Sequence, residues 1–218
     1  MKVLLSWSSG KDSAWALHVL RQDPAVTVAA LLTTFNEEAD RVAMHAVRRT
    51  LVEAQAAAAG LPLWQIPIPS PCPNDVYEAR MRAALVRARE EEFTHVAFGD
   101  LFLEDIRRYR EDRMAATGLS PIFPLWKRPT PDLAREMLDG GLEAVITCVD
   151  PAQLDARFAG RPYDATLLDD LPGTVDPCGE RGEFHTFCVA GPMLEQRLGV
   201  RVGEIVHRDG FVFADLTM

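Results

Sequence analysis

The stretch VLLSWSSGKDSAWAL, residues 3–17, joins a short apolar run to a loop of small residues and then to a helical pattern. The run over residues 3–6 is typical of a strand buried on both faces. From Asp12 onward, apolar residues including Ala14, Leu17 and Leu20 recur with helical spacing, and Pro24 ends the pattern. A small-residue loop between a strand and a helix predicts a phosphate site, because the start of a helix attracts anions.

The loop carries the groups that a bound nucleotide would need. Small residues let the backbone approach phosphate oxygens closely, and Lys11 adds a positive charge. Asp12 can hold Mg²⁺, because this ion prefers one or two carboxylates together with water. A Walker A loop is excluded, since Leu5 stands where its first glycine is required and Asp12 follows the lysine. We expect the phosphates to contact Ser8, Ser9, Gly10, Lys11, Asp12 and Ser13.

Strand and helix patterns alternate at least four times over the first 128 residues. Apolar runs predict strands at 3–6, 26–32, 63–69, 95–98 and 122–126, with a polar loop at 33–41. Helical patterns lie between these runs, including a face of Met44, Val47, Leu51 and Ala54, a helix capped by Asn74, and one over 103–117. This order predicts an α/β fold with a doubly wound parallel five-stranded sheet.

The pattern changes from about residue 130. A helix over 130–138 and a strand over 144–150 precede a loop-rich segment at 169–187. Two alternating runs then flank Asp209 and Gly210, a pair typical of two-residue hairpins. We therefore expect two domains: a domain that carries the phosphate loop at 1–128 and a smaller α+β domain at 129–218.

Composition limits the partners and the compartment. The 218-residue chain is 48% apolar and has a net charge of −9, which argues against a nucleic-acid partner. It has no apolar run of membrane-spanning length and no signal-peptide pattern, and its four cysteines contain no CxxC pair. We expect a cytoplasmic protein with no membrane partner, and a homodimer as the commonest oligomeric state.

Three segments in order carry a resemblance to a known family. SSGKDS, residues 8–13, resembles the SGGxDS signature of the PP-loop ATP pyrophosphatases, the adenine nucleotide α-hydrolase superfamily with its HUP-type fold. The later stretches FGDLFLEDIRRYREDR…GLSPIFPLW, within 98–126, and CGERGEFHTF…GP, within 178–192, resemble the diphthine–ammonia ligase family. The resemblance implies a ligase that splits ATP into AMP and pyrophosphate.

That chemistry implies roles for particular residues. A carboxylate acceptor, on a small molecule or a protein, is activated as its adenylate, and ammonium or an amine then displaces AMP. Adenine is expected near Leu32, Thr33 and Gly99, while Ser9 replaces the first glycine of the signature. In the acceptor half of the site, three residues remain candidates for the base that takes a proton from the amine: Glu180, Glu183 and His185. The predicted catalytic residues are Lys11, Asp12, Asp100, Glu180, Glu183 and His185.

Two other functions remain open from the sequence. PP-loop proteins include tRNA-modifying enzymes, although the acidic charge and the missing CxxC pair argue against that class. A nucleotide-binding sensor without turnover has the same loop and fold, and the fold alone does not decide.

Overall fold

The first sheet is built around five parallel strands. The structure is a computed structural model that describes residues 1–42 and 47–218. In the described residues the parallel strands run in the order β4-β2-β1-β5-β6, and the two-residue β3 pairs antiparallel with the end of β2. The bounds are β1 Lys2–Ser6, β2 Thr27–Asn36, β3 Arg41–Val42, β4 Leu63–Ile68, β5 His95–Ala97 and β6 Ser120–Ile122.

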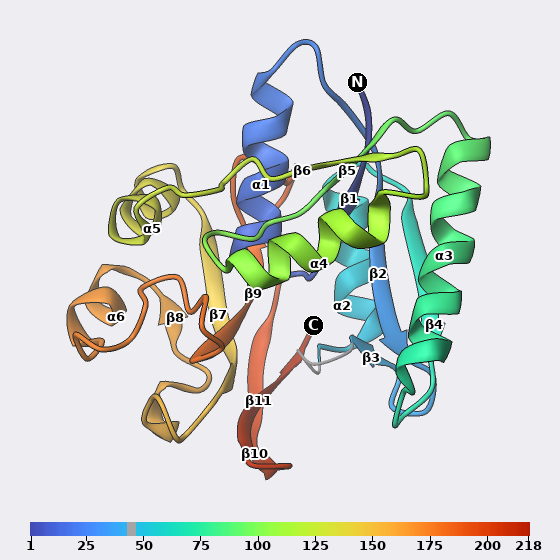
Figure 1. Ribbon diagram of the computed structural model, residues 1–218. Coiled ribbons are helices and arrows are strands. Elements are labelled where there is room, and N and C mark those ends of the chain that lie inside the picture. Colours follow the sequence, from blue (N-terminus) through green and yellow to red (C-terminus); the bar gives the residue numbers. More distant parts are fainter. Residues whose placement is uncertain (43–46) are drawn as a thin grey trace.

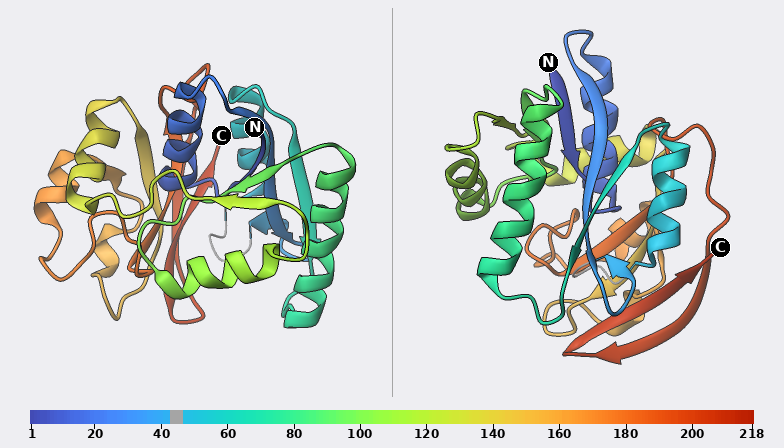
Figure 2. Two further views of the ribbon diagram at one scale, coloured as in Figure 1. Left: turned by 45° about the horizontal axis from the view of Figure 1, so that its top comes forward. Right: turned by 90° about the vertical axis from the view of Figure 1, so that its right-hand side faces the viewer.

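Helices cover both faces of this sheet, as the two views of Figure 2 show. Apolar side chains of α1 and α2 belong to one core cluster, and those of α3 and α4 belong to the other. The predicted doubly wound α/β fold is therefore confirmed. The helices are α1 Lys11–Gln22, α2 Arg49–Ala58, α3 Asn74–Glu90 and α4 Glu104–Met114.

A second, antiparallel sheet follows, and β7 lies at its centre (Figure 1). β9 pairs along the whole of β7, while β8 and β11 share its other edge. The predicted hairpin is confirmed, because Asp209 and Gly210 turn with positive φ between β10 and β11. The elements are α5 Thr130–Asp139, β7 Glu143–Val149, a 3₁₀ helix Ala156–Phe158, β8 Pro162–Tyr163, α6 Ala165–Asp170, β9 Phe184–Ala190, β10 Arg201–Arg208 and β11 Phe211–Thr217.

The two sheets share one hydrophobic core through α1. Buried side chains of α1, such as Trp15 and Leu17, belong to the same cluster as Phe184 and Phe187 of β9. The indole of Trp15 also donates a hydrogen bond to Glu136 of α5 at 3.0 Å. The first helix after the predicted phosphate loop is thus the element on which both halves of the chain pack.

Several predicted boundaries differ from the structure. Residues 33–36 continue β2 instead of forming a loop, because β4 pairs with β2 as far as Asn36. Asn74 is the first residue of α3 and makes no capping bond, while the prolines of β4 do mark an edge strand. Met44 lies outside the described residues, and α2 begins at Arg49. The domain boundary after residue 128 stays a prediction.

The order of the strands places two loops side by side. β1 and β5 are parallel neighbours, while the connections that follow them run to opposite sides of the sheet. Ligands of open α/β sheets bind at such a reversal, beyond the carboxyl ends of the strands. The described residues contain no helix that is both long and apolar enough to cross a membrane.

Candidate active site

The loop between β1 and α1 is fixed by its neighbours on both sides. Ser9 has φ of 70°, and its carbonyl accepts hydrogen bonds from the Cys188 N–H at 2.9 Å and the Gln55 side chain at 3.0 Å. Gly10 lies so close to β9 that a Cβ there would stand 3.0 Å from the Thr186 carbonyl oxygen. The loop is therefore held in one shape, and a side chain at position 10 would push it away from β9.

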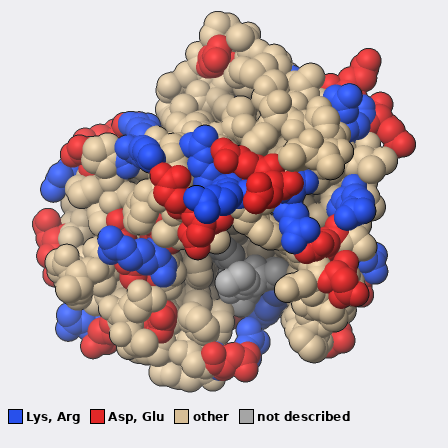
Figure 3. All heavy atoms as spheres, viewed as in Figure 1, with Lys and Arg blue, Asp and Glu red and all other residues tan. Residues whose placement is uncertain are grey.

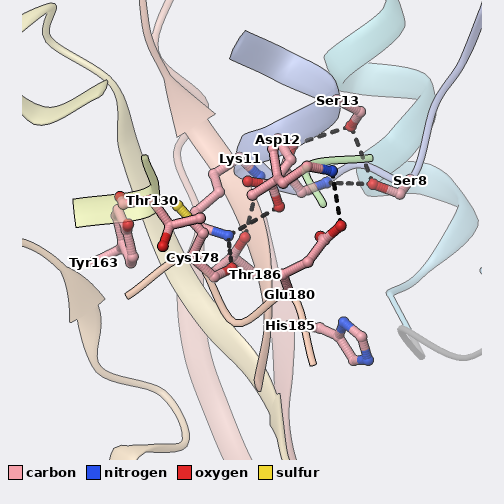
Figure 4. Close-up of polar contacts among 12 residues, drawn as sticks. Ser8, Lys11, Asp12, Ser13, Thr130, Tyr163, Cys178, Glu180, His185 and Thr186 are labelled. Carbon is pink, nitrogen blue, oxygen red and sulfur yellow. Dashed lines mark hydrogen bonds and ion pairs between the residues drawn. The ribbon is translucent and has the colours of Figure 1, made fainter. Parts of the chain in front are cut away.

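Hydroxyl groups surround the start of α1. Ser8 donates to the Ser13 hydroxyl at 3.1 Å, and Ser13 donates to the Gly10 carbonyl at 3.0 Å. From β9, the hydroxyl of Thr186 accepts a hydrogen bond from the Lys11 N–H at 3.1 Å (Figure 4). Thr186 thus caps α1 from the second sheet, since Gly10 has no side chain with which to do so.

Lys11 lies in the junction between the two sheets and is only 2% exposed. Its ammonium group contacts Asp12 Oδ2 at 2.9 Å and also donates to the Cys178 carbonyl. The rings of Tyr163 and Phe184 lie 5.5 and 5.4 Å away, within cation–π range. Burial lowers the pKa of Lys11, but attraction to Asp12 and other acidic groups outweighs it, so the pKa is raised. The side chain stays charged.

Only one of the two carboxylate oxygens of Asp12 has a partner among the described residues. Its Oδ1 is buried and has no hydrogen-bond partner among the described residues, whereas Oδ2 contacts Lys11. Burial raises the pKa of the Asp12 carboxyl, and the Lys11 ammonium only partly offsets this. An unpaired buried carboxylate oxygen is costly, so a cation beside Oδ1 would be favoured.

The segment after β5 forms the opposite wall. A Cβ on Gly99 would lie 3.0 Å from the Ser13 nitrogen, so only glycine lets this segment pack on α1. Asp100 binds Arg110 of α4 through both carboxylate oxygens, and the guanidinium lies 4.4 Å from the centre of the Phe98 ring.

Glu180 reaches this wall from the second sheet. Its Oε1 accepts hydrogen bonds from the N–H groups of Leu101 at 2.7 Å and Phe102 at 3.4 Å. Burial raises the pKa of Glu180 to about 7, and the nearby charges of Asp12 and Asp100 add to this effect. The carboxyl group therefore exchanges a proton near neutral pH.

A cleft of about 220 Å³ joins these groups. The cleft adjoins a larger cavity of about 630 Å³ between α3 and α4, and Phe98 and Arg110 line both. Figure 3 shows positive and negative side chains interspersed over α4 on this face. The cleft is lined by Ser6, Ser8, Gly10, Lys11, Asp12, Ser13, Phe98, Gly99, Asp100, Arg110, Cys178, Gly179, Glu180, Phe184, His185 and Thr186.

Comparison with known proteins identifies the family of this chain. A family model described as diphthamide synthase N-terminal domain matches residues 1–119, and one described as diphthamide synthase C-terminal domain matches residues 129–216. The chain belongs to the diphthamide synthase family. Its relatives include diphthine–ammonia ligases of Bos taurus and Homo sapiens, each 27% identical over 98% of this chain and 88% of the relative. A Schizosaccharomyces pombe relative with this name is 25% identical over 97% of this chain and 38% of its own length.

The resemblance found in the sequence is therefore confirmed, and most of the predicted residues line one cleft. This diphthamide synthase family member brings the loop of residues 8–13 together with Asp100, Glu180 and His185. Ser9 is not among the residues that line the cleft, and its hydroxyl is buried without a partner among the described residues. His45, which the sequence places next to Met44 in the second helical pattern, lies outside the described residues.

Three predicted residues lie behind the cleft or beside it. Glu183 is 2% exposed and accepts hydrogen bonds from the Asp176 and Arg181 N–H groups at 2.8 and 2.9 Å, so it braces its own loop. Thr33 is buried and donates to the Trp7 carbonyl at 2.7 Å. Leu32 lines the cavity between α3 and α4.

Two residues outside the predicted site, Arg110 and Thr186, line the cleft. Arg110 lies in a helix of mixed charges, where it is indistinguishable by pattern from its neighbours Arg107 and Arg108. Thr186 lies in a stretch that was read as loop. Residues 184–190, FHTFCVA, do not alternate between apolar and polar side chains, so no period-2 signal indicates this strand or directs Thr186 at α1.

Proposed function

We propose that this chain uses ATP to activate a carboxylate as its adenylate and then converts it to an amide with ammonia. Membership of the diphthamide synthase family and the names of its curated relatives support ATP dependence, ligase activity and ammonia as the nitrogen donor. In this proposal residues 1–128 bind ATP, and residues 129–218 complete the site for the acceptor. The acceptor is a carboxylate, and the relatives' names make diphthine the first to test.

The β- and γ-phosphates of ATP would lie on the loop of residues 8–13. The start of α1 supplies N–H groups and the positive end of the helix dipole, and Ser8 and Ser13 add hydroxyl groups beside them. Lys11 contributes its charge from the wall of the cleft, where Asp12 and Cys178 hold it. This placement leaves the α-phosphorus toward Asp100 and Glu180 for attack by the carboxylate.

Mg²⁺ would bind at Asp12 together with the phosphates. The buried Oδ1 of Asp12 lacks a partner among the described residues, and these residues contain no cluster of three or more metal-ligating side chains. One carboxylate together with phosphate oxygens and water is a coordination that Mg²⁺ accepts. When bound there, Mg²⁺ would neutralise charge on the departing pyrophosphate.

Adenosine would occupy the cavity between α3 and α4. Leu32 lines this cavity, and Phe98 and Arg110 connect it with the phosphate cleft. Its volume of about 630 Å³ and its apolar floor suit a nucleoside. Gly99 lines the phosphate cleft next to Phe98, so in this proposal adenine passes close to Gly99.

Glu180 is the best of the three candidates for the base. A base works best when its pKa lies near the working pH, and burial raises the pKa of Glu180 to about 7. Burial and the Lys11 charge lower the pKa of His185 to about 4, so His185 is a weak acceptor. Glu183 already has both carboxylate oxygens in hydrogen bonds. We therefore assign proton removal from ammonium to Glu180 and the bracing of its loop to Glu183.

The observation that carries this proposal is that Glu180 and the start of α1 line one cleft, together with Asp12, whose buried Oδ1 has no partner among the described residues. The test incubates the chain with ATP, Mg²⁺ and ammonium, and with a panel of carboxylic acids that includes diphthine. AMP and pyrophosphate released in step with an amide product are expected. ADP and phosphate would contradict the proposal, and ATP binding without pyrophosphate release for any acceptor would favour the sensor instead.

A further inference from the structure

The hairpin formed by β10 and β11 has an exposed outer strand. All eight residues of β10 are exposed, and among the described residues β10 pairs with β11 alone. Figures 1 and 2 show the hairpin at the periphery of the molecule. Such an edge presents unpaired N–H and C=O groups to any strand that approaches it.

The edge is also apolar where it is most regular. Ile205 and Val206 are 46% and 40% exposed, and the neighbouring Phe211 is 38% exposed. Val206 pairs with Phe213, so both side chains stand on one face of the hairpin, beside Phe211. Exposed apolar side chains on an open strand edge are unusual in a protein that stays monomeric.

The charges along β10 are self-complementary in one register. If two copies of β10 pair antiparallel about Val206, each Glu204 stands opposite Arg208 of the second copy, and Val206 stands opposite itself. In this register Val206 and Arg208 belong to the regular part of the strand, while Glu204 lies within the irregularity between Val202 and Ile205. A register centred between Glu204 and Ile205 would instead place Arg201 opposite Arg208, which is repulsive.

We propose that this chain forms a two-fold dimer in which β10 pairs with β10 of a second copy, centred on Val206. The pairing joins the two antiparallel sheets into one continuous sheet and covers the apolar edge. Two Glu204–Arg208 pairs, one on each side of the axis, set the register. The dimer is independent of the proposed reaction, so failure of either one leaves the other standing.

The test measures mass in solution by sedimentation over a wide range of protein concentration. The wild-type chain is expected to form dimers that dissociate on dilution. Glu204→Arg and Arg208→Glu each place like charges opposite one another and should raise the dissociation constant by about tenfold to a hundredfold. The double variant Glu204→Arg/Arg208→Glu restores opposite charges and should restore the dimer.

A matched charge swap on another surface is the control. Arg87 and Glu91 form an exposed ion pair at 2.7 Å on the surface of α3, so Arg87→Glu/Glu91→Arg should leave the mass unchanged. A wild-type chain that is monomeric at every concentration overturns the proposal. Single variants that dimerise normally, or a double variant that stays monomeric, also overturn it.

Cross-linking tests the register directly. Directly opposite residues of antiparallel strands have Cα atoms about 4.5–5.5 Å apart, within the range of a disulfide. In a Cys72→Ser background, Val206→Cys should therefore cross-link two copies under mild oxidation. Val86→Cys, at an exposed position of α3, should not. Equal cross-linking of both variants, or none at position 206, would contradict the pairing.

Discussion

At the scale of single residues, Ser9 is the position where the loop departs from the family signature. The backbone of Ser9 has φ of 70°, a left-handed conformation that favours glycine. Its hydroxyl is buried and has no partner among the described residues. The serine therefore adds backbone strain and an unpaired polar group at the centre of the phosphate loop.

Replacing Ser9 by glycine should stabilise the folded chain. Relief of left-handed strain contributes roughly 1–2 kcal/mol, and the greater freedom of glycine in the unfolded chain offsets roughly 0.5–1 kcal/mol. We expect Ser9→Gly to raise the free energy of unfolding by about 1 kcal/mol in urea titrations. Ser9→Ala removes only the hydroxyl and should gain less. A loss of stability in Ser9→Gly would show that the hydroxyl has a stabilising partner.

The role given to Glu180 predicts a pH dependence of catalysis. The carboxyl group must be ionised to accept a proton, so the turnover rate should rise with pH through about 7. Glu180→Gln should lose about 100- to 10,000-fold in rate and the inflection with it. His185→Asn serves as the control, because its pKa of about 4 places its own titration elsewhere. An inflection near 7 that survives in Glu180→Gln would assign the base to another group.

The same shift predicts a pH dependence of stability. The pKa of Glu180 is about 7 in the folded chain and 4.5 without its surroundings, so the unfolded chain loses this proton first. Stability should therefore fall as the pH rises from about 4.5 to about 7. Glu180→Gln carries no such titration. In denaturant titrations across this window, the free energy of unfolding of Glu180→Gln should increase relative to that of the wild type as the pH rises.

At the scale of elements, the start of α1 depends on a strand that is 175 residues away in sequence. Thr186 of β9 accepts a hydrogen bond from the Lys11 N–H, so the helix that we propose binds phosphate is completed only when the second sheet is docked. Thr186→Val keeps the size but removes the acceptor, and should cost about 1 kcal/mol of stability. Thr186→Val should also weaken ATP binding in calorimetry, and an unchanged affinity would contradict the capping role. The matched control is Thr147→Val, which removes a hydroxyl that donates to the His185 carbonyl at 3.3 Å and should leave the ATP affinity unchanged.

The elements that the sequence predicted well are those whose pattern is local. The strand before Ser8, the helix after Gly10 and the turn at Asp209 and Gly210 each carry their own signal. β9 was missed because its residues follow a run rich in glycine, proline and acidic side chains, and because its partner β7 is distant in sequence. The capping role of Thr186 and the place of Arg110 follow from such distant packing, so no local pattern reveals them.

At the scale of the whole molecule, the two sheets are joined by a shared core, by Lys11 and by a peripheral ion cluster. Lys11 binds the Cys178 carbonyl, so it connects the phosphate loop to the second sheet. On the far side, Asp215 of β11 contacts Arg41 at 2.9 Å and Arg48 at 2.6 Å. The two sheets on either side of the cleft are therefore held together by several separate contacts.

The ion cluster at Asp215 makes a whole-molecule prediction. The hydrogen bond from Arg48, and then the contact with Arg41, lower the pKa of Asp215 in the folded chain. Its contribution to stability is therefore present above the unfolded value of 3.8 and lost as the pH falls through the lower folded value. Asp215→Asn should lower the melting temperature by about 2–4 °C at neutral pH, and the difference should shrink in acid. Asp209→Asn, at the exposed turn of the same hairpin, keeps the left-handed turn and should not change it. A difference between Asp215→Asn and wild type that persists unchanged at low pH would mean that the charge of Asp215 is not what joins β11 to Arg41 and Arg48.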